Sequence, residues 1–150
     1  KNSPFLKHNF SSVISVQFFQ NNDLKTKVFE QLKQIKPDLI VLAGFLKKIP
    51  VPYIEFFEKK IINIHPSLLP SYGGKGMYGS IIHNKVIENN EKETGITIHY
   101  VSEHYDSGQI IFQKKISISD FDSVKTIEEK IHNLEYEYYP KIIESIILNR

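Results

Sequence analysis

The sequence contains no cysteine and no tryptophan, and its only arginine is the last residue, Arg150. Without cysteine the chain has no disulfide framework. The near absence of arginine excludes bidentate guanidinium clamping of a phosphate or carboxylate by the rest of the chain. Any bound phosphate must therefore be held by lysine or by backbone amides. A composition rich in Ile, Lys and Asn, as A- and T-rich codons encode, explains the missing arginines equally well.

Neither sign of charge dominates, because 19 Lys and Arg stand against 17 Asp and Glu, with the two signs interspersed. A net charge of +2 is too small to indicate a nucleic-acid surface, so a small-molecule partner is more plausible. No apolar run approaches the roughly 20 residues of a membrane helix, and the first nine residues lack the apolar stretch of a signal peptide. We expect a soluble, cytoplasmic protein without membrane or nucleic-acid partners, folded as one domain over residues 1–150.

Strands and helices alternate along the first half of the chain. The pattern predicts strands over 12–17, 38–45 and 60–65, with helical stretches between them over 21–35 and 50–57. This order favours an α/β fold with a mostly parallel central sheet flanked by helices. The run 38–45 is apolar without alternation, which predicts a central strand covered on both faces.

The second half begins with an irregular segment, 66–79, that holds two prolines and four of the seven glycines. Irregular segments of this length inside a compact domain tend to be functional. We expect a helix over 80–88 and a hairpin of strands 96–101 and 109–113. Apolar residues at helical spacing from Val124 to Ile146 predict a long C-terminal helix, with Thr126 and Glu129 in a capping box.

Asn63 and His65 end the strand predicted at 60–65. A strand's period of two puts both side chains on one face, and ligands of open parallel sheets bind beyond such strand ends. An amide donor beside an imidazole suits the stabilisation of an oxyanion during acyl transfer. Spacing alone also fits Asn63 as a turn cap and His65 as a satisfied, half-buried histidine.

The stretch Asn-Ile-His-Pro-Ser-Leu-Leu-Pro, residues 63–70, resembles the signature of formyltransferases that use 10-formyltetrahydrofolate. The segments 37–46 and 95–101 and the triplet Asp106-Ser-Gly resemble the same family in order and spacing. The resemblance implies a Rossmann-like formyltransferase fold, a folate cleft at the strand ends and no metal.

The resemblance also implies catalytic roles. Asn63 would polarise the formyl oxygen, His65 would act as general acid, and Asp106 would lie against His65. An aspartate there would favour the protonated imidazolium. Considered alone, Asp106 also fits a turn residue, since Asp-Ser-Gly suits a tight connection.

By the same resemblance, two segments enclose the folate. Leu46, Lys47, Lys48 and Ile49 would line the pterin pocket, although the two lysines equally fit solvated charges. The loop 102–108, with Ser102 and Tyr105, would form the opposite wall.

The loop 71–79 resembles that of family members whose acceptor is glycinamide ribonucleotide, a substrate of purine biosynthesis. Glu135 would then contact the ribonucleotide, and His99 would line the cleft; a solvated helix charge and a structural histidine are the alternatives. For the remaining histidines no spacing indicates a metal site, and we expect surface or packing roles. They are His8, His83, His104 and His132.

The family's opening strand and glycine-rich phosphate turn have no counterpart here, so we expect a formyltransferase domain that is incomplete at its amino terminus. An incomplete sheet would expose an edge and favour association, for example as a homodimer. Alternatives to a complete transferase are a noncatalytic folate-binding fragment, a formyltetrahydrofolate hydrolase, or a formyltransferase acting on another amine.

Overall fold

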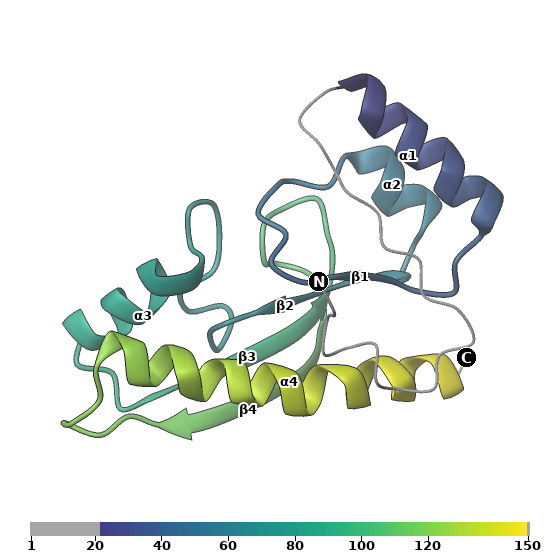
Figure 1. Cartoon of the computed structure of the whole chain (residues 1–150). Coiled ribbons are helices and arrows are strands. Elements are labelled where there is room, and N and C mark those ends of the chain that lie inside the picture. The colour runs from purple at the N-terminus through teal and green to yellow at the C-terminus, as the bar shows by residue number, and fades with distance from the viewer. Residues whose placement is uncertain (1–21, 150) are drawn as a thin grey trace.

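The structure, a computed structural model, describes residues 22–149, so the strand predicted at 12–17 and His8 lie outside the described residues. The elements follow the order α1 (Asn22–Ile35), β1 (Ile40–Leu42), α2 (Val51–Phe56), β2 (Ile61–His65), α3 (Gly79–Glu88), β3 (Glu93–Tyr100), β4 (Ile110–Ser117) and α4 (Val124–Leu148). α1 and α2 lie together over one end of the sheet, and α4 runs along β3 and β4 (Figure 1).

The four strands form one sheet in the order β1-β2-β3-β4. The α/β class, the hairpin and the long C-terminal helix are confirmed. The described part of the sheet is mixed rather than mostly parallel, because β1 and β2 are parallel while β2–β3 and β3–β4 are antiparallel. The segment 66–92 returns the chain to the end of the sheet where β2 finished, and β3 therefore starts there and runs back.

The apolar run 38–45 forms a strand of only three residues, β1, and the prediction of burial on both faces is wrong. Ile40 and Leu42 pack against the cluster formed with α1 and α2. Val41 points to the opposite face and is 39% exposed. Absence of alternation in the sequence did not distinguish a strand covered on two faces from one covered on a single face.

The prediction of a capping box at the start of α4 was displaced by one turn. Ser123, not Thr126, is the N-cap, and its side chain accepts from the Thr126 backbone N–H while the Thr126 hydroxyl accepts from the Ser123 backbone N–H. Asp122 adds a carboxylate that accepts from the Thr126 hydroxyl and pairs with Lys130. These bonds, to Lys130 first, lower the pKa of Asp122 to about 2.

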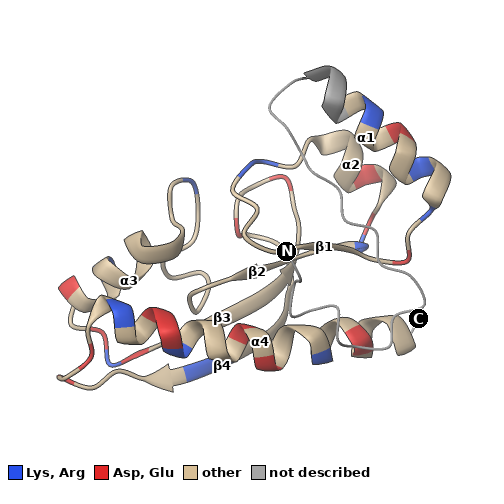
Figure 2. Cartoon of the chain, in the orientation of Figure 1, with Lys and Arg blue, Asp and Glu red and all other residues tan. Residues whose placement is uncertain are grey.

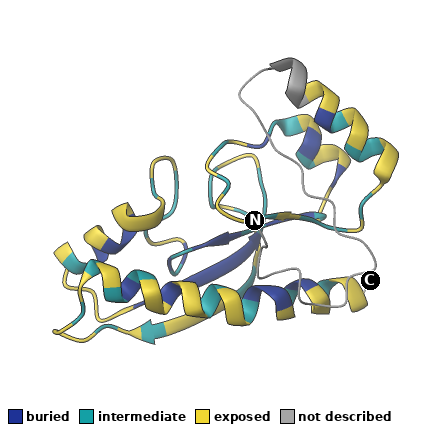
Figure 3. Cartoon of the chain, in the orientation of Figure 1, coloured by how far each residue is buried: buried dark blue, intermediate teal, exposed yellow. Residues whose placement is uncertain are grey.

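Two hydrophobic clusters cover opposite faces of β2. Ile62 and Ile64 pack with α3, α4 and β3, whereas Ile61 packs with α1 and α2. Figure 3 shows β2 and much of β3 as the most continuously buried part of the sheet. The odd-numbered Asn63 and His65 share the face of Ile61 and extend beyond the α1–α2 cluster. Because of this alternation, polar side chains occupy one face of β2 at its C-terminal end.

Acidic and basic residues are interspersed along the described elements rather than gathered by sign (Figure 2). No helix within residues 22–149 is both long enough and apolar enough to cross a membrane.

Candidate active site

The antiparallel register of β2 and β3 brings four polar side chains to one face of the sheet. Asn63 lies directly opposite His99, and His65 lies opposite Thr97. Their immediate neighbours on both strands point the other way, into the core: Ile62, Ile64, Ile96 and Ile98. The apolar half of each alternating strand therefore fixes the direction of the polar half.

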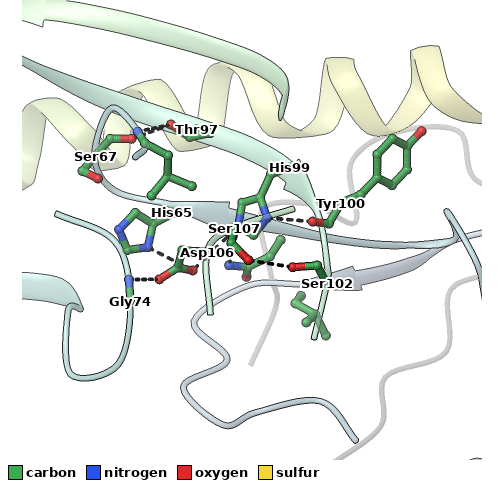
Figure 4. A network of polar contacts seen from close by, with 12 residues as sticks. His65, Ser67, Gly74, Thr97, His99, Tyr100, Ser102, Asp106 and Ser107 are labelled. Carbon is green, nitrogen blue, oxygen red and sulfur yellow. Dashed lines mark hydrogen bonds and ion pairs between the residues drawn. The ribbon is translucent and has the colours of Figure 1, made fainter. Parts of the chain in front are cut away.

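Asp106 reaches these histidines from the loop between β3 and β4. Its Oδ1 lies 3.6 Å from Nδ1 of His65 and 3.7 Å from Nε2 of His99. Its Oδ2 accepts a 2.9 Å hydrogen bond from the backbone N–H of Gly74, and Figure 4 shows the carboxylate between this amide and the two rings. Asp106 has a φ of 53°, a left-handed conformation that aspartate tolerates better than most residues.

His65 is only 4% exposed, and both of its ring nitrogens face acceptors. Nε2 lies 2.8 Å from the backbone carbonyl of Tyr72. A carbonyl oxygen can only accept, so Nε2 carries hydrogen and Nδ1 is the nitrogen that faces Asp106. The 3.6 Å separation of Nδ1 from Oδ1 of Asp106 is longer than a direct hydrogen bond.

His99 is buried behind Asn63, with 2% of its surface exposed. Its Nδ1 lies 2.9 Å from the carbonyl oxygen of Tyr100, and its Nε2 lies 3.4 Å from Nδ2 of Asn63. Burial lowers the pKa of His99, an effect opposed in part by the Tyr100 carbonyl and the charge of Asp106. The neutral imidazole is therefore favoured.

A buried network holds the irregular segment that follows β2. The Thr97 hydroxyl accepts from Leu69 N (3.0 Å) and Gln113 Nε2 (2.9 Å), and donates to Ser67 O at 2.6 Å. This one hydroxyl thus uses both its donor and its acceptor capacity. The network ties the loop to β3 and β4 just before Tyr72, the residue that bonds His65.

Two cavities meet at the polar face. The smaller, of about 40 Å³, is lined mainly by the segment after β1 and the β3–β4 loop. The larger, of about 330 Å³, is lined by the loop 74–79 and the facing sides of α3 and α4. Asn63 and Asp106 line both, so they stand at the boundary between two spaces.

The residues expected to surround a folate divide between these cavities. Lys47, Lys48, Ile49 and Ser102 line the smaller cavity, Leu46 lines the larger, and Tyr105 lines both. Of the residues expected to contact the acceptor, Glu135 lines the larger cavity. His99 lines the smaller one instead, beneath Asn63.

Three histidines assigned to surface or packing roles line the cavities. His104 lines the smaller one, and His83 and His132 line the larger. Nδ1 of His132 lies 3.0 Å from Oε2 of Glu135. The spacing of Glu128, His132 and Glu135 along α4 puts them on one helical face, a signal in the sequence that could have placed them together.

His83 is 1% exposed, and its Nδ1 has no hydrogen-bond partner among the described residues. Burial lowers the pKa of His83, opposed by the charge of Glu128. Within residues 22–149, no three His, Asp or Glu side chains are arranged to hold a metal ion.

The chain is similar to known formyl transferases over nearly its whole length. A formyl transferase family model matches residues 5–143. The phosphoribosylglycinamide formyltransferase of Bacillus subtilis is 42% identical over 120 residues, which cover 80% of this chain and 59% of that protein. The chloroplastic phosphoribosylglycinamide formyltransferase of Vigna unguiculata is 40% identical over 121 residues, 81% of this chain and 39% of that protein.

The fold comparison agrees. The crystal structure of phosphoribosylglycinamide formyltransferase from Bacillus halodurans superposes with a TM-score of 0.75 at 35% identity, covering 86% of this chain and 64% of that one. The chain spans less than two thirds of each of these three proteins. The match to the family model and these similarities show that the chain belongs to the formyl transferase family.

Proposed function

We propose that this protein transfers the formyl group of 10-formyltetrahydrofolate to the amine of glycinamide ribonucleotide, a step of purine biosynthesis. The observation that carries the proposal is the position of Asn63 and Asp106 at the boundary of two cavities. A formyl donor bound on one side of this boundary and an amine bound on the other would meet there. The acceptor is inferred from the names of the similar proteins.

The chemistry follows from the groups at this boundary. The amine nitrogen attacks the formyl carbon, and a new carbon–nitrogen bond forms as the formyl oxygen becomes an oxyanion. An N–H of Asn63 and protonated His65 stabilise that oxyanion. The bond to folate N10 then breaks; N10 gains one proton and the amine loses one. Water held by Asp106 at the wall of the larger cavity, which His65 also lines, relays the proton.

Binding is assigned to the walls of the two cavities. The segment Leu46, Lys47, Lys48 and Ile49 and the facing loop with Ser102 and Tyr105 hold the pterin, with backbone groups supplying most of its hydrogen bonds. Glu135, on the wall of the larger cavity, contacts the ribonucleotide. No metal takes part in these steps.

The test is a turnover assay with residues 1–150, 10-formyltetrahydrofolate and glycinamide ribonucleotide, which follows formation of tetrahydrofolate and of the formylated amine. His65→Ala should remove most turnover while folate binding, measured by calorimetry, remains. Asn63→Ala should lower turnover by about 100-fold, the typical loss of an oxyanion donor. Asn84→Ala is the matched control, since Asn84 is an exposed residue of α3 that bonds Ser80 within the helix.

The outcomes separate the alternatives. Folate binding without turnover would indicate a noncatalytic folate-binding protein. Release of formate in the absence of any amine would indicate a hydrolase. Full turnover of His65→Ala would refute the proposed chemistry.

A further inference from the structure

His99 lies next to the amide that the proposed function requires at the formyl oxygen. Its Nε2 is 3.4 Å from Nδ2 of Asn63, and the two residues are directly opposed across β2 and β3. At 2% exposure, His99 has little access to water and must meet its hydrogen-bonding needs inside the protein. Strand register therefore places these two side chains next to each other inside the protein.

The other ring nitrogen of His99 determines the tautomer. Nδ1 lies 2.9 Å from the Tyr100 carbonyl oxygen, which can only accept, so Nδ1 carries hydrogen. The ring is neutral because burial lowers its pKa. In a neutral imidazole with hydrogen on Nδ1, Nε2 has only a lone pair and must accept.

This tautomer determines which way round the Asn63 amide lies. An asparagine side chain can turn over, exchanging its NH₂ group and its oxygen with little change of shape. A lone pair on His99 Nε2 favours the NH₂ group on that side, where one N–H bonds the ring. The second N–H of the same group then remains for a ligand in the cavities that Asn63 lines. The opposite orientation would place the amide oxygen against Nε2 of His99, lone pair against lone pair.

The neutral ring also bears on the use of Asp106. Oδ1 of Asp106 is almost equidistant from His65 and His99, at 3.6 and 3.7 Å. If both rings were protonated they would divide the stabilisation offered by one carboxylate. When His99 is neutral, the negative charge of Asp106 stabilises His65 alone. Nε2 of His65 already donates to the Tyr72 carbonyl.

We propose that His99 is a positioning residue: locked with hydrogen on Nδ1 by the Tyr100 carbonyl, its Nε2 accepts from Asn63 and holds that amide with an N–H directed to the formyl oxygen. The inference rests on the proposed function for the identity of the ligand. The tautomer and the amide orientation do not depend on it.

The first experiment needs no substrate. Two-bond ¹H–¹⁵N correlation spectra of the imidazole rings in the full chain at neutral pH distinguish the two neutral tautomers and the imidazolium. We expect His99 to be neutral with hydrogen on Nδ1. A signal from the other tautomer or from the imidazolium would overturn the proposal whether or not the protein transfers formyl groups.

The second experiment compares two substitutions that retain different halves of the ring. In His99→Gln, the side-chain oxygen reaches the place of Nε2 and can accept from Asn63. In His99→Asn, the amide reaches only the place of Nδ1 and cannot. We expect kcat to fall about tenfold or more in His99→Asn, with KM for the folate changed less than kcat, and most of this loss to be restored in His99→Gln.

Thermal unfolding of both variants shows whether they fold. If His99→Asn does not, a crystal structure of the folded His99→Gln with the Asn63 oxygen turned towards residue 99 would still count against the proposal. Equal kcat in the two folded variants would contradict a role for the Nε2 acceptor. An absence of turnover in the wild-type protein contradicts the proposed function, while the tautomer measurement still decides the positioning claim.

Discussion

The backbone carbonyl of Tyr72 accepts a 2.8 Å hydrogen bond from Nε2 of His65. Tyr72 is itself held at its other end, where its hydroxyl donates to Glu91 and accepts from Asn89, each at 2.7 Å. Two residues further on, Gly74 N–H bonds Asp106. A single turn of chain therefore contacts both His65 and Asp106, and its anchor lies at the C-terminal end of α3.

Removing the Tyr72 hydroxyl should loosen this turn. We expect Tyr72→Phe to lower kcat by about three- to tenfold with little change in KM, because the His65 ring loses a rigid acceptor while the cavity walls persist. Replacing both partners, Asn89→Ala with Glu91→Ala, should have a similar effect. Adding Tyr72→Phe to that double variant should then cause no further loss; full additivity in steady-state kinetics would show that the hydroxyl does not act through these partners.

Gly73 occupies a position without space for a side chain. A Cβ there would lie 2.6 Å from Cδ2 of Leu69 and 3.3 Å from Cβ of Asp106. We expect Gly73→Ala to displace the Asp106 loop, to lengthen the His65–Asp106 distance and to lower turnover about tenfold. Gly76→Ala is the comparison, since it strains a residue with φ of 85° but meets no atom within 4 Å. Crystal structures should show the 3.6 Å distance unchanged in Gly76→Ala.

Tyr139 joins α4 to the sheet. Its buried hydroxyl donates to Leu42 O at 2.8 Å, and burial raises its pKa well above the ordinary tyrosine range, so it remains a donor. Tyr139→Phe should lower the free energy of unfolding by about 1–2 kcal/mol, because it deprives the Leu42 carbonyl of this donor. Tyr136→Phe, on the exposed side of the same helix, should change it by less than about 0.5 kcal/mol. Urea unfolding of both variants checks the difference, and equal values would show that the bond contributes nothing.

Burial of His83 makes stability depend on pH. Its pKa is below the ordinary 6.5 in the folded protein, so the unfolded chain takes up a proton first as the pH falls. The stability from a neutral His83 is fully present above pH 6.5 and decreases as the pH falls from there through the folded pKa. We expect His83→Gln to lose less stability than wild type between about pH 7.5 and about pH 5.5 in urea unfolding. The pKa of His99 is also lowered, so His99 should still contribute to the pH dependence of stability in that variant. Identical pH dependence of the two proteins would count against a contribution from His83.

Local pattern was sufficient for much of the fold. The helical spacing of α4 and the alternation in the hairpin appear in the structure within a few residues of their predicted bounds. The period of two also put Asn63 and His65 on one face. Each of these depends on residues near in sequence, whose relation is set by backbone geometry alone.

Long-range relations were beyond such reasoning. The direction of β3 depends on where the segment 66–92 returns the chain to the sheet. The exposure of Val41 depends on which elements pack against each face of β1. The placement of His83 and His132 at the larger cavity likewise depends on how α3 packs against α4.

The sequence by itself determined the family resemblance, which rests on contiguous motifs. It also determined that Asn63 and His65 share a face, because these two residues lie in one short strand. Only the tertiary structure decided that His99 faces Asn63, that the Tyr72 carbonyl bonds His65, and that Asp106 lies between the two rings. Strand register, which burial of the isoleucines on the opposite face fixes, brings some of these groups together. The hydrogen bonds of the loop after β2 to Thr97 and Gln113 place the others.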